Sequence, residues 1–264
     1  MHRYDQLSVL VSLVLLGIAL SSIIELPIKP LTLIVLDRSF PLSLSAPQII
    51  ALLLAAMVWT GTDSMVRSHP KVRSAGLWYA LTFCPLPTLF TSVAFFLVLP
   101  LSTNRPFWLG GLALIGLLLS MIIVGELYTI DRNDGIARLG LNLMAYLVAL
   151  TLYIAIYKEE RSPLSAMAAL LVSGLLALDL LRVGDTGRTW LCALVAGLVM
   201  GEAAWALNYW PISGLRGGMF LLLIFYVITG LAQQGLLGRL TRWVLVEFAI
   251  VAVVGLILLY NYAP

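Results

Sequence analysis

Six acidic residues that could do chemistry lie inside or beside long apolar segments of this sequence. They are Glu25, Asp63, Glu126, Asp179, Glu202 and Glu247. An ionised side chain in hydrocarbon costs roughly 2.5–3.5 kcal/mol on insertion scales, so such residues either serve a function or lie between helices with partners. These acids are therefore the first candidates for a functional site.

Glu202 is followed by Trp205 and Tyr209 at spacings of three and seven residues, which place the three side chains on one helix face. We expect Glu202 to point into the helical bundle. It could form an ion or substrate site there, with Arg105 or Arg216 as its partner. The favoured alternative is a protonated or hydrogen-bonded glutamate that fixes helix packing, with the aromatic rings as interfacial anchors.

Small residues mark the segment that carries Glu202 as a packing helix. Ala193, Gly197 and Gly201 recur every four residues and form a ridge that lets another helix approach closely. Glu25 is the other acid expected near the outer face, and two serines one turn earlier could bond to it or to the backbone. With Glu202, Trp205 and Tyr209 it completes a candidate intramembrane polar site, unless it simply sits at the water interface.

A second candidate site is predicted at the cytoplasmic face. It consists of Asp63, Arg67, Glu126, Asp179, Arg182, Asp185 and Arg188. Three of its acids have an arginine three or four residues further on, a spacing that allows ion pairing on a helical turn. Carboxylates that face one aqueous cleft would instead suit a Mg²⁺-bound diphosphate. We expect local ion pairs, with no metal, cofactor or catalytic residue.

Other chemistries lack their characteristic residues. Cys84 and Cys192 lie inside apolar segments without CxxC spacing, which favours a packing role. The only histidines are His2 and His69, so neither haem ligation within the membrane nor histidine-based catalysis is expected. The net charge of +3 is dispersed along the chain, and this argues against nucleic acid as a partner.

The elements that must position these residues are membrane helices. Of the 264 residues, 61% are hydrophobic and 11% charged, whereas soluble domains carry roughly a quarter charged residues. The apolar blocks have the length that an α-helix needs to cross about 30 Å of hydrocarbon. We predict an all-α polytopic transmembrane bundle that forms one integral membrane domain over residues 1–264. Its partners are the lipid bilayer and, as an open alternative, other membrane subunits.

About nine spans are expected. They are Leu7–Leu26, Pro47–Thr60, Ala75–Leu99, Phe107–Ile130, Leu139–Tyr157, Pro163–Leu181, Thr189–Leu207, Gly218–Gln234 and Trp243–Tyr260. An even number follows if the second or third does not cross. The second could extend through Asp63 into Met65, and Pro85 and Pro87 should kink the third.

Two further features of the topology can be predicted. Most Lys and Arg residues fall on the side that holds Arg3, Arg67 and Arg132, which places the N-terminus in the cytoplasm. The connection from Ile28 to Ala46 contains β-branched and alternating Leu/Ser residues, which suggest a short β-hairpin on the outer face. The protein is thus expected in the cell membrane as a multi-pass chain.

Two families share residues with this chain. Asp63, and Asp179 with Asp185, fall after the second and sixth spans, where intramembrane polyprenyl transferases carry their Asp-rich motifs, and Gly184–Thr189 resembles the end of the second motif. The stretch Thr62–Arg67 offers a single acid where that family has an Asn and several Asp. This partial resemblance implies a lipid-handling enzyme whose Asp motifs are degenerate.

The second resemblance is broader. The run Gly61-Thr62-Asp63, continuing through Arg67-Ser68-His69-Pro70, and the stretch from Glu202 to Pro211 resemble an uncharacterised family of bacterial multi-pass membrane proteins, a domain of unknown function. It implies a bacterial inner-membrane location, but it does not assign an activity. The sequence therefore favours a non-enzymatic membrane protein, either a small carrier or a component of a membrane complex, with the lipid-handling enzyme as the alternative.

Overall fold

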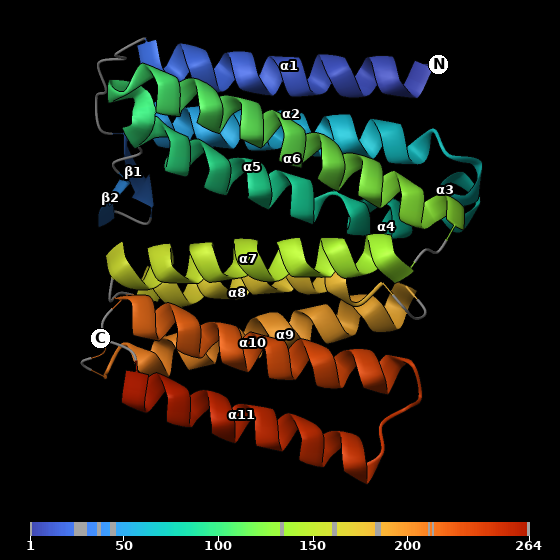
Figure 1. Cartoon of the computed structure of the whole chain (residues 1–264). Coiled ribbons are helices and arrows are strands. Elements are labelled where there is room, and N and C mark those ends of the chain that lie inside the picture. The colour runs from blue at the N-terminus through green and yellow to red at the C-terminus, as the bar shows by residue number, and fades with distance from the viewer. Residues whose placement is uncertain are drawn as a thin grey trace. The chain divides into compact units, whose positions relative to one another are not determined.

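The computed structural model describes residues 2–23, 31–35, 38–42, 46–132, 135–159, 163–182, 186–210, 212 and 214–262. Long helices dominate it (Figure 1). The helices are α1 His2–Ile23, α2 Ala46–Arg67, α3 Pro70–Ala75, α4 Leu77–Ala80, α5 Pro85–Val98, α6 Arg105–Arg132, α7 Gly135–Glu159, α8 Pro163–Leu180, α9 Thr186–Leu207, α10 Gly214–Leu236 and α11 Arg242–Tyr262. Two 3₁₀ turns, Leu81–Phe83 and Leu99–Thr103, flank α5.

The described residues contain 8 helical segments that are long and apolar enough to cross a membrane. This agrees with the prediction of a polytopic helical membrane protein. The segment predicted as a sixth span corresponds to α8, whose apolar part, Ser165–Leu180, is shorter than the others. The number of crossings and the cytoplasmic N-terminus stay predictions.

Prolines interrupt the third candidate span, as the sequence indicates. The candidate span Leu77–Thr103 is not one continuous helix, because α4 gives way to a 3₁₀ turn and a new helix begins at Pro85. Proline has no backbone N–H to donate and its ring clashes with the preceding turn, so a helix restarts there more easily than it continues. The second span extends beyond Met65 to Arg67, the last residue of α2.

The connection between α1 and α2 contains two short strands. Strand β1, Leu31–Val35, pairs antiparallel with β2, Arg38–Leu42, and the register places Leu31 opposite Leu42. The predicted position of this segment on the outer face stays a prediction.

The chain divides into two compact units. Unit 1 comprises residues 1–70 and 87–127, and unit 2 comprises residues 71–86 and 128–264. The prediction that the whole chain forms one membrane domain stays a prediction, and the units are described separately below.

In unit 1, α1 and α2 pack through reciprocal contacts between glycine and leucine. Gly17 of α1 faces Leu54 of α2, and Gly61 of α2 faces Leu10 of α1. Each pair of positions is seven residues apart along its helix, so the two helices run antiparallel with the same face in contact along two turns. Leu15 of α1 packs against Gly116 of α6 in the same way, so α6 also contacts α1.

In unit 2, α8 and α9 approach each other more closely. The predicted ridge of Ala193, Gly197 and Gly201 lies on the buried face of α9, and the prediction of close helix packing is confirmed. A Cβ atom added at Gly197 would lie 2.8 Å from the carbonyl oxygen of Leu170 and 3.2 Å from Cα of Gly174. The two backbones therefore meet where both helices lack a side chain, as in small-xxx-small packing.

Candidate functional site

The Asp179–Arg182 pair is buried where α8 ends. The side chains are 3% and 9% exposed, and the guanidinium contacts the carboxylate directly. Nε of Arg182 also donates to the carbonyl oxygen of Asp179 at 3.1 Å, and its guanidinium lies 4.0 Å from the ring centroid of Phe83. A buried charge is tolerated only with such compensation. Asp179 and Arg182 thus neutralise each other inside unit 2.

Neighbouring contacts attach the same region to α4 and α9. Thr189 donates its hydroxyl to the carbonyl oxygen of Leu181 at 3.1 Å. Nε1 of Trp190 donates to the carbonyl oxygen of Trp78 at 3.3 Å, and the two rings meet edge to face. The predicted acid, Asp179, therefore lies in the region where α4, α8 and α9 contact one another.

The second predicted ion pair is in unit 1 and is accessible. Nε of Arg67 donates to Oδ1 of Asp63 at 2.7 Å across one turn of α2, with side chains 48% and 18% exposed. The predictions that Asp63 pairs with Arg67 and that Asp179 pairs with Arg182 are confirmed.

The other predicted members of the cytoplasmic-face site belong to different parts of the chain. Glu126 is fully buried in α6 of unit 1, whereas Arg188 is exposed on the first turn of α9. Asp185 lies outside the described residues. Within the part of the chain that the structure describes, no three His, Cys, Asp or Glu side chains are grouped to hold a metal ion. A shared cavity for all of the predicted acids stays a prediction.

Glu202 does not point into the packed interior of unit 2, and the prediction that it points into the helical bundle of the whole chain stays a prediction. It is exposed, like Trp205 and Tyr209, whose rings lie 6.4 Å apart. The prediction that the three share one face is consistent with this exposure. Glu202 directly follows Gly201, and successive residues of a helix are about 100° apart around its axis. Because Gly201 faces α8, Glu202 is turned away from that contact.

Of the two partners predicted for Glu202, only Arg216 belongs to the same unit. The side chain of Glu202 forms neither a hydrogen bond nor an ion pair with the residues that the structure describes, Arg216 included. Arg105 belongs to unit 1 and Glu202 to unit 2, so the predicted pairing of Glu202 with Arg105 stays a prediction. Glu25, the remaining member of the predicted polar site, lies outside the described residues.

Tyrosines along α7 form polar contacts that the sequence analysis missed. The hydroxyl of Tyr153 lies 2.6 Å from the hydroxyl of Ser173 on α8, and that of Tyr146 lies 3.1 Å from Thr229 on α10. The Tyr157 hydroxyl donates to the carbonyl oxygen of Leu207 at 2.9 Å. The spacing of these tyrosines, seven and four residues, places them on one helix face and could have indicated the contacts.

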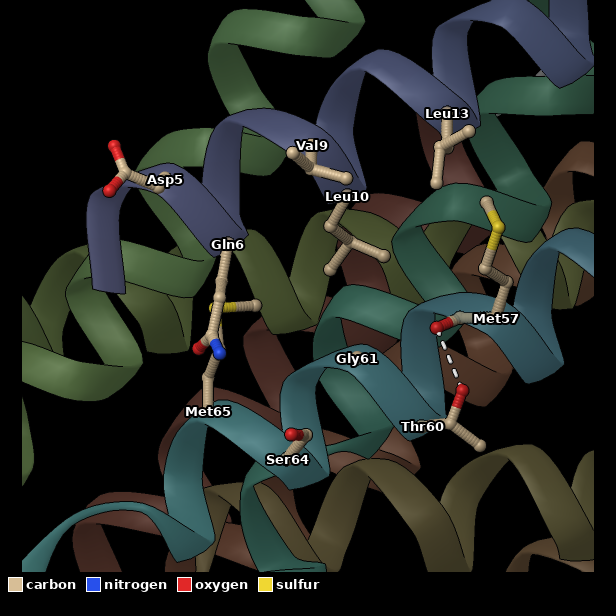
Figure 2. Close-up of a pocket in the computed structure, with 10 residues that line it drawn as sticks. All are labelled: Asp5, Gln6, Val9, Leu10, Leu13, Met57, Thr60, Gly61, Ser64 and Met65. Carbon is tan, nitrogen blue, oxygen red and sulfur yellow. Dashed lines mark hydrogen bonds between the residues drawn. The ribbon is translucent and has the colours of Figure 1, made fainter. Parts of the chain in front are cut away.

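A cavity of about 480 Å³ lies between α1 and α2 in unit 1 (Figure 2). Its lining is mostly apolar, and Figure 2 shows Leu10 directed toward Gly61 while the carboxylate of Asp5 points away from α2. The Thr60 hydroxyl donates to the carbonyl oxygen of Met57 at 3.1 Å. None of the predicted site residues that the structure describes lines this cavity.

The comparisons with known proteins identify a family. Residues 27–261 match the family described as "Protein of unknown function (DUF5656)", and the chain therefore belongs to it. This agrees with the predicted resemblance to a domain of unknown function. Neither the curated proteins nor the solved structures contain a match to the chain.

Proposed function

We propose that this member of the family is a non-enzymatic subunit of a membrane protein assembly, docked to its partner through the exposed face of α9. In this proposal the chain crosses a bacterial inner membrane about nine times, with its N-terminus in the cytoplasm. The single observation that carries it is the position of Glu202, an exposed carboxyl group that follows three exposed leucines along α9.

The exposed face of α9 is suited to a helix rather than to lipid alone. This face contains exposed residues at spacings of three and four along the helix. They are Leu191, Leu194, Leu198 and Glu202. Glu202 lies five residues before the end of α9, or about 7 Å along the axis. Ionisable groups within membrane segments usually pair with another polar group, because hydrocarbon offers them no hydrogen bond.

The occupant that fits this face is a transmembrane helix of a different protein with an apolar surface. It would carry a Lys, Arg or amide side chain at the depth of Glu202. Such interhelical polar contacts contribute about 0.6 kcal/mol on average in membranes, while apolar packing supplies the remaining contact.

Two observations favour this function over the alternatives. The carboxylates of Asp63 and Asp179 are already bonded to arginines of their own segments, whereas a prenyl diphosphate site would need them for Mg²⁺. A carrier needs polar groups that face a path, but the hydroxyl groups of Tyr146 and Tyr153 are bonded to side chains of neighbouring helices.

Site-specific photo-crosslinking in native membranes tests the docking face. A photoreactive residue at Leu198, one turn before Glu202, should give a defined protein adduct, whereas one at Ile250 on the exposed surface of α11 should not. Glu202→Leu should remove the Leu198 adduct, and Glu202→Gln should retain it because an amide still forms hydrogen bonds.

Three outcomes would overturn the proposal. One is an adduct with twice the 28.8 kDa chain mass, which would identify a second copy. Another is crosslinking to lipid only. The third is magnesium-dependent binding of a prenyl diphosphate that is lost in Asp63→Ala or Asp185→Ala, which would favour the lipid-handling enzyme.

A further inference from the structure

A second cavity, of about 730 Å³, lies between α10 and α11 at the end of unit 2 where α11 finishes. Figure 1 shows the beginning of α10 and the end of α11 at the same end of these helices. Residues that line the cavity include Trp210, Arg216, Phe220, Leu256, Ile257 and Asn261. Its size is within the range of roughly 300–1,000 Å³ that is typical of sites for small ligands.

The lining is polar at one end and apolar at the other. Arg216 is the third residue of α10, and Asn261 is next to the last residue of α11, so both lie at the ends of their helices. Phe220 is one turn further into α10, and Leu256 and Ile257 are at least one turn further into α11. If these helices cross the membrane, the polar end lies at the water interface and the apolar end within the hydrocarbon.

Arg216 supplies a cation that forms no ion pair with the residues that the structure describes. Its Nε atom is buried and has no hydrogen-bond partner in the part of the chain that the structure describes. No described carboxylate lines the cavity. A buried guanidinium N–H without an acceptor is unfavourable, and an anion that enters the cavity would supply one.

The walls of the cavity are held in place by neighbouring contacts. The Tyr157 hydroxyl lies 3.3 Å from the carbonyl oxygen of Trp210, which fixes the turn before α10. The Trp210 and Phe220 rings meet edge to face at 6.2 Å. The amide of Asn261 donates to the carbonyl oxygen of Ile257 at 2.9 Å. The polar and apolar parts of the lining therefore keep a defined order along the helices.

We propose that this cavity binds one anionic phospholipid of the surrounding leaflet. The phosphate accepts hydrogen bonds from the Arg216 guanidinium, and an acyl chain lies along Phe220, Leu256 and Ile257. Two features of the cavity point to this occupant. Arg216 complements the negative charge of the head group, and the lining changes from polar to apolar along the helices. A phospholipid changes in the same direction, from a charged head group at the interface to an apolar chain below it.

Lipid retention by the purified full-length chain in detergent tests this site. Phosphatidylglycerol and phosphatidylcholine with identical acyl chains are added together, and the protein-bound lipids are counted by native mass spectrometry. Both lipids carry the phosphate, but phosphatidylcholine also carries a choline cation that the Arg216 guanidinium repels, so phosphatidylglycerol should be retained about tenfold better. Arg216→Gln should abolish this preference, and Arg216→Lys should retain part of it because the charge remains.

Two control variants separate charge from cavity. Arg242→Gln removes an exposed arginine from the first turn of α11, and it should leave the preference unchanged. Ile257→Trp fills the apolar part of the cavity and should lower the retention of both lipids. Size-exclusion profiles equal to that of the parent chain show that each variant is folded.

Three results would overturn the proposal. They are equal retention of the two lipids by the parent chain, an unchanged preference in Arg216→Gln, and displacement of phosphatidylglycerol by inorganic phosphate. The last would show that the site takes a free anion rather than a lipid. The crosslinking experiment at α9 is independent of all three, since the two sites use different residues.

Discussion

The two units hold their helices together by different means. In unit 2 the ion pair Asp179–Arg182 is buried and the backbones of α8 and α9 meet at Gly197. In unit 1 the corresponding ion pair, Asp63–Arg67, is accessible. The close helix contact of unit 1, at Gly61, involves only the flexible end of the Leu10 side chain. The same residue types therefore have different energetic consequences, which depend on burial and on the rigidity of the neighbour.

The largest effect is expected at the buried ion pair. Asp179→Ala leaves the Arg182 guanidinium inside unit 2 without its carboxylate, and it should destabilise the protein by roughly 3–5 kcal/mol. The measurement is thermal or denaturant unfolding of the purified chain in detergent. The double variant Asp179→Ala, Arg182→Leu should recover part of the loss. A loss in the single variant no larger than that in Asp63→Ala would contradict the comparison.

Next in size is the backbone contact between α8 and α9. Gly197→Val would place a side chain against the carbonyl oxygen of Leu170, and overpacking of this kind costs about 1–3 kcal/mol. Gly61→Ala in unit 1 should cost less, because the tip of Leu10 can rotate away. Unfolding of both variants in the same detergent compares the two contacts.

Gly140 provides a control for glycine replacement itself. A Cβ atom there would meet nothing within 4 Å, so Gly140→Ala on α7 should leave stability unchanged or raise it slightly. If Gly61→Ala were as damaging as Gly197→Val, the distinction between rigid and flexible neighbours would fail.

A smaller effect is expected at the hydrogen bond between α7 and α8. Tyr153→Phe removes the hydroxyl bonded to Ser173, and such bonds contribute about 0.6 kcal/mol on average in membrane proteins. The Ser173 hydroxyl keeps its bond to the carbonyl oxygen of Ala169 at 2.5 Å, which limits the loss. Unfolding of Tyr153→Phe and the double variant with Ser173→Ala gives the coupling energy. A coupling near zero would show that the bond contributes nothing.

The smallest effect is expected at the accessible ion pair. Asp63→Ala or Arg67→Ala should change stability by about 0.3–0.5 kcal/mol, as for other exposed pairs on one helix. The effect should shrink further when unfolding is measured at high salt, because exposed charges are screened. A loss comparable to that of Asp179→Ala, or one that salt does not alter, would indicate that Asp63 has a buried partner in the folded membrane protein.

Local features of the fold were predictable because they depend on residues near one another in sequence. Prolines at 85 and 87 predicted the interrupted helix, and the four-residue spacing of small residues predicted the close contact of α9. The ion pairs at Asp63 and Asp179 followed from spacing along the chain. The exposure of Glu202 within unit 2 could not be predicted, because its neighbours in sequence show which residues share a face but not which face is covered.

The sequence by itself determined that this is a helical membrane protein, where its apolar helices lie, and which acids have an arginine within reach. These properties follow from apolar length and from the geometry of a helical turn. Only the tertiary structure decided which ion pair is buried, that Glu202 is exposed, and that Arg216 lines a cavity beside α11. Burial and cavities depend on which distant segments pack together, and in an almost uniformly apolar sequence many packings satisfy the same hydrophobic pattern.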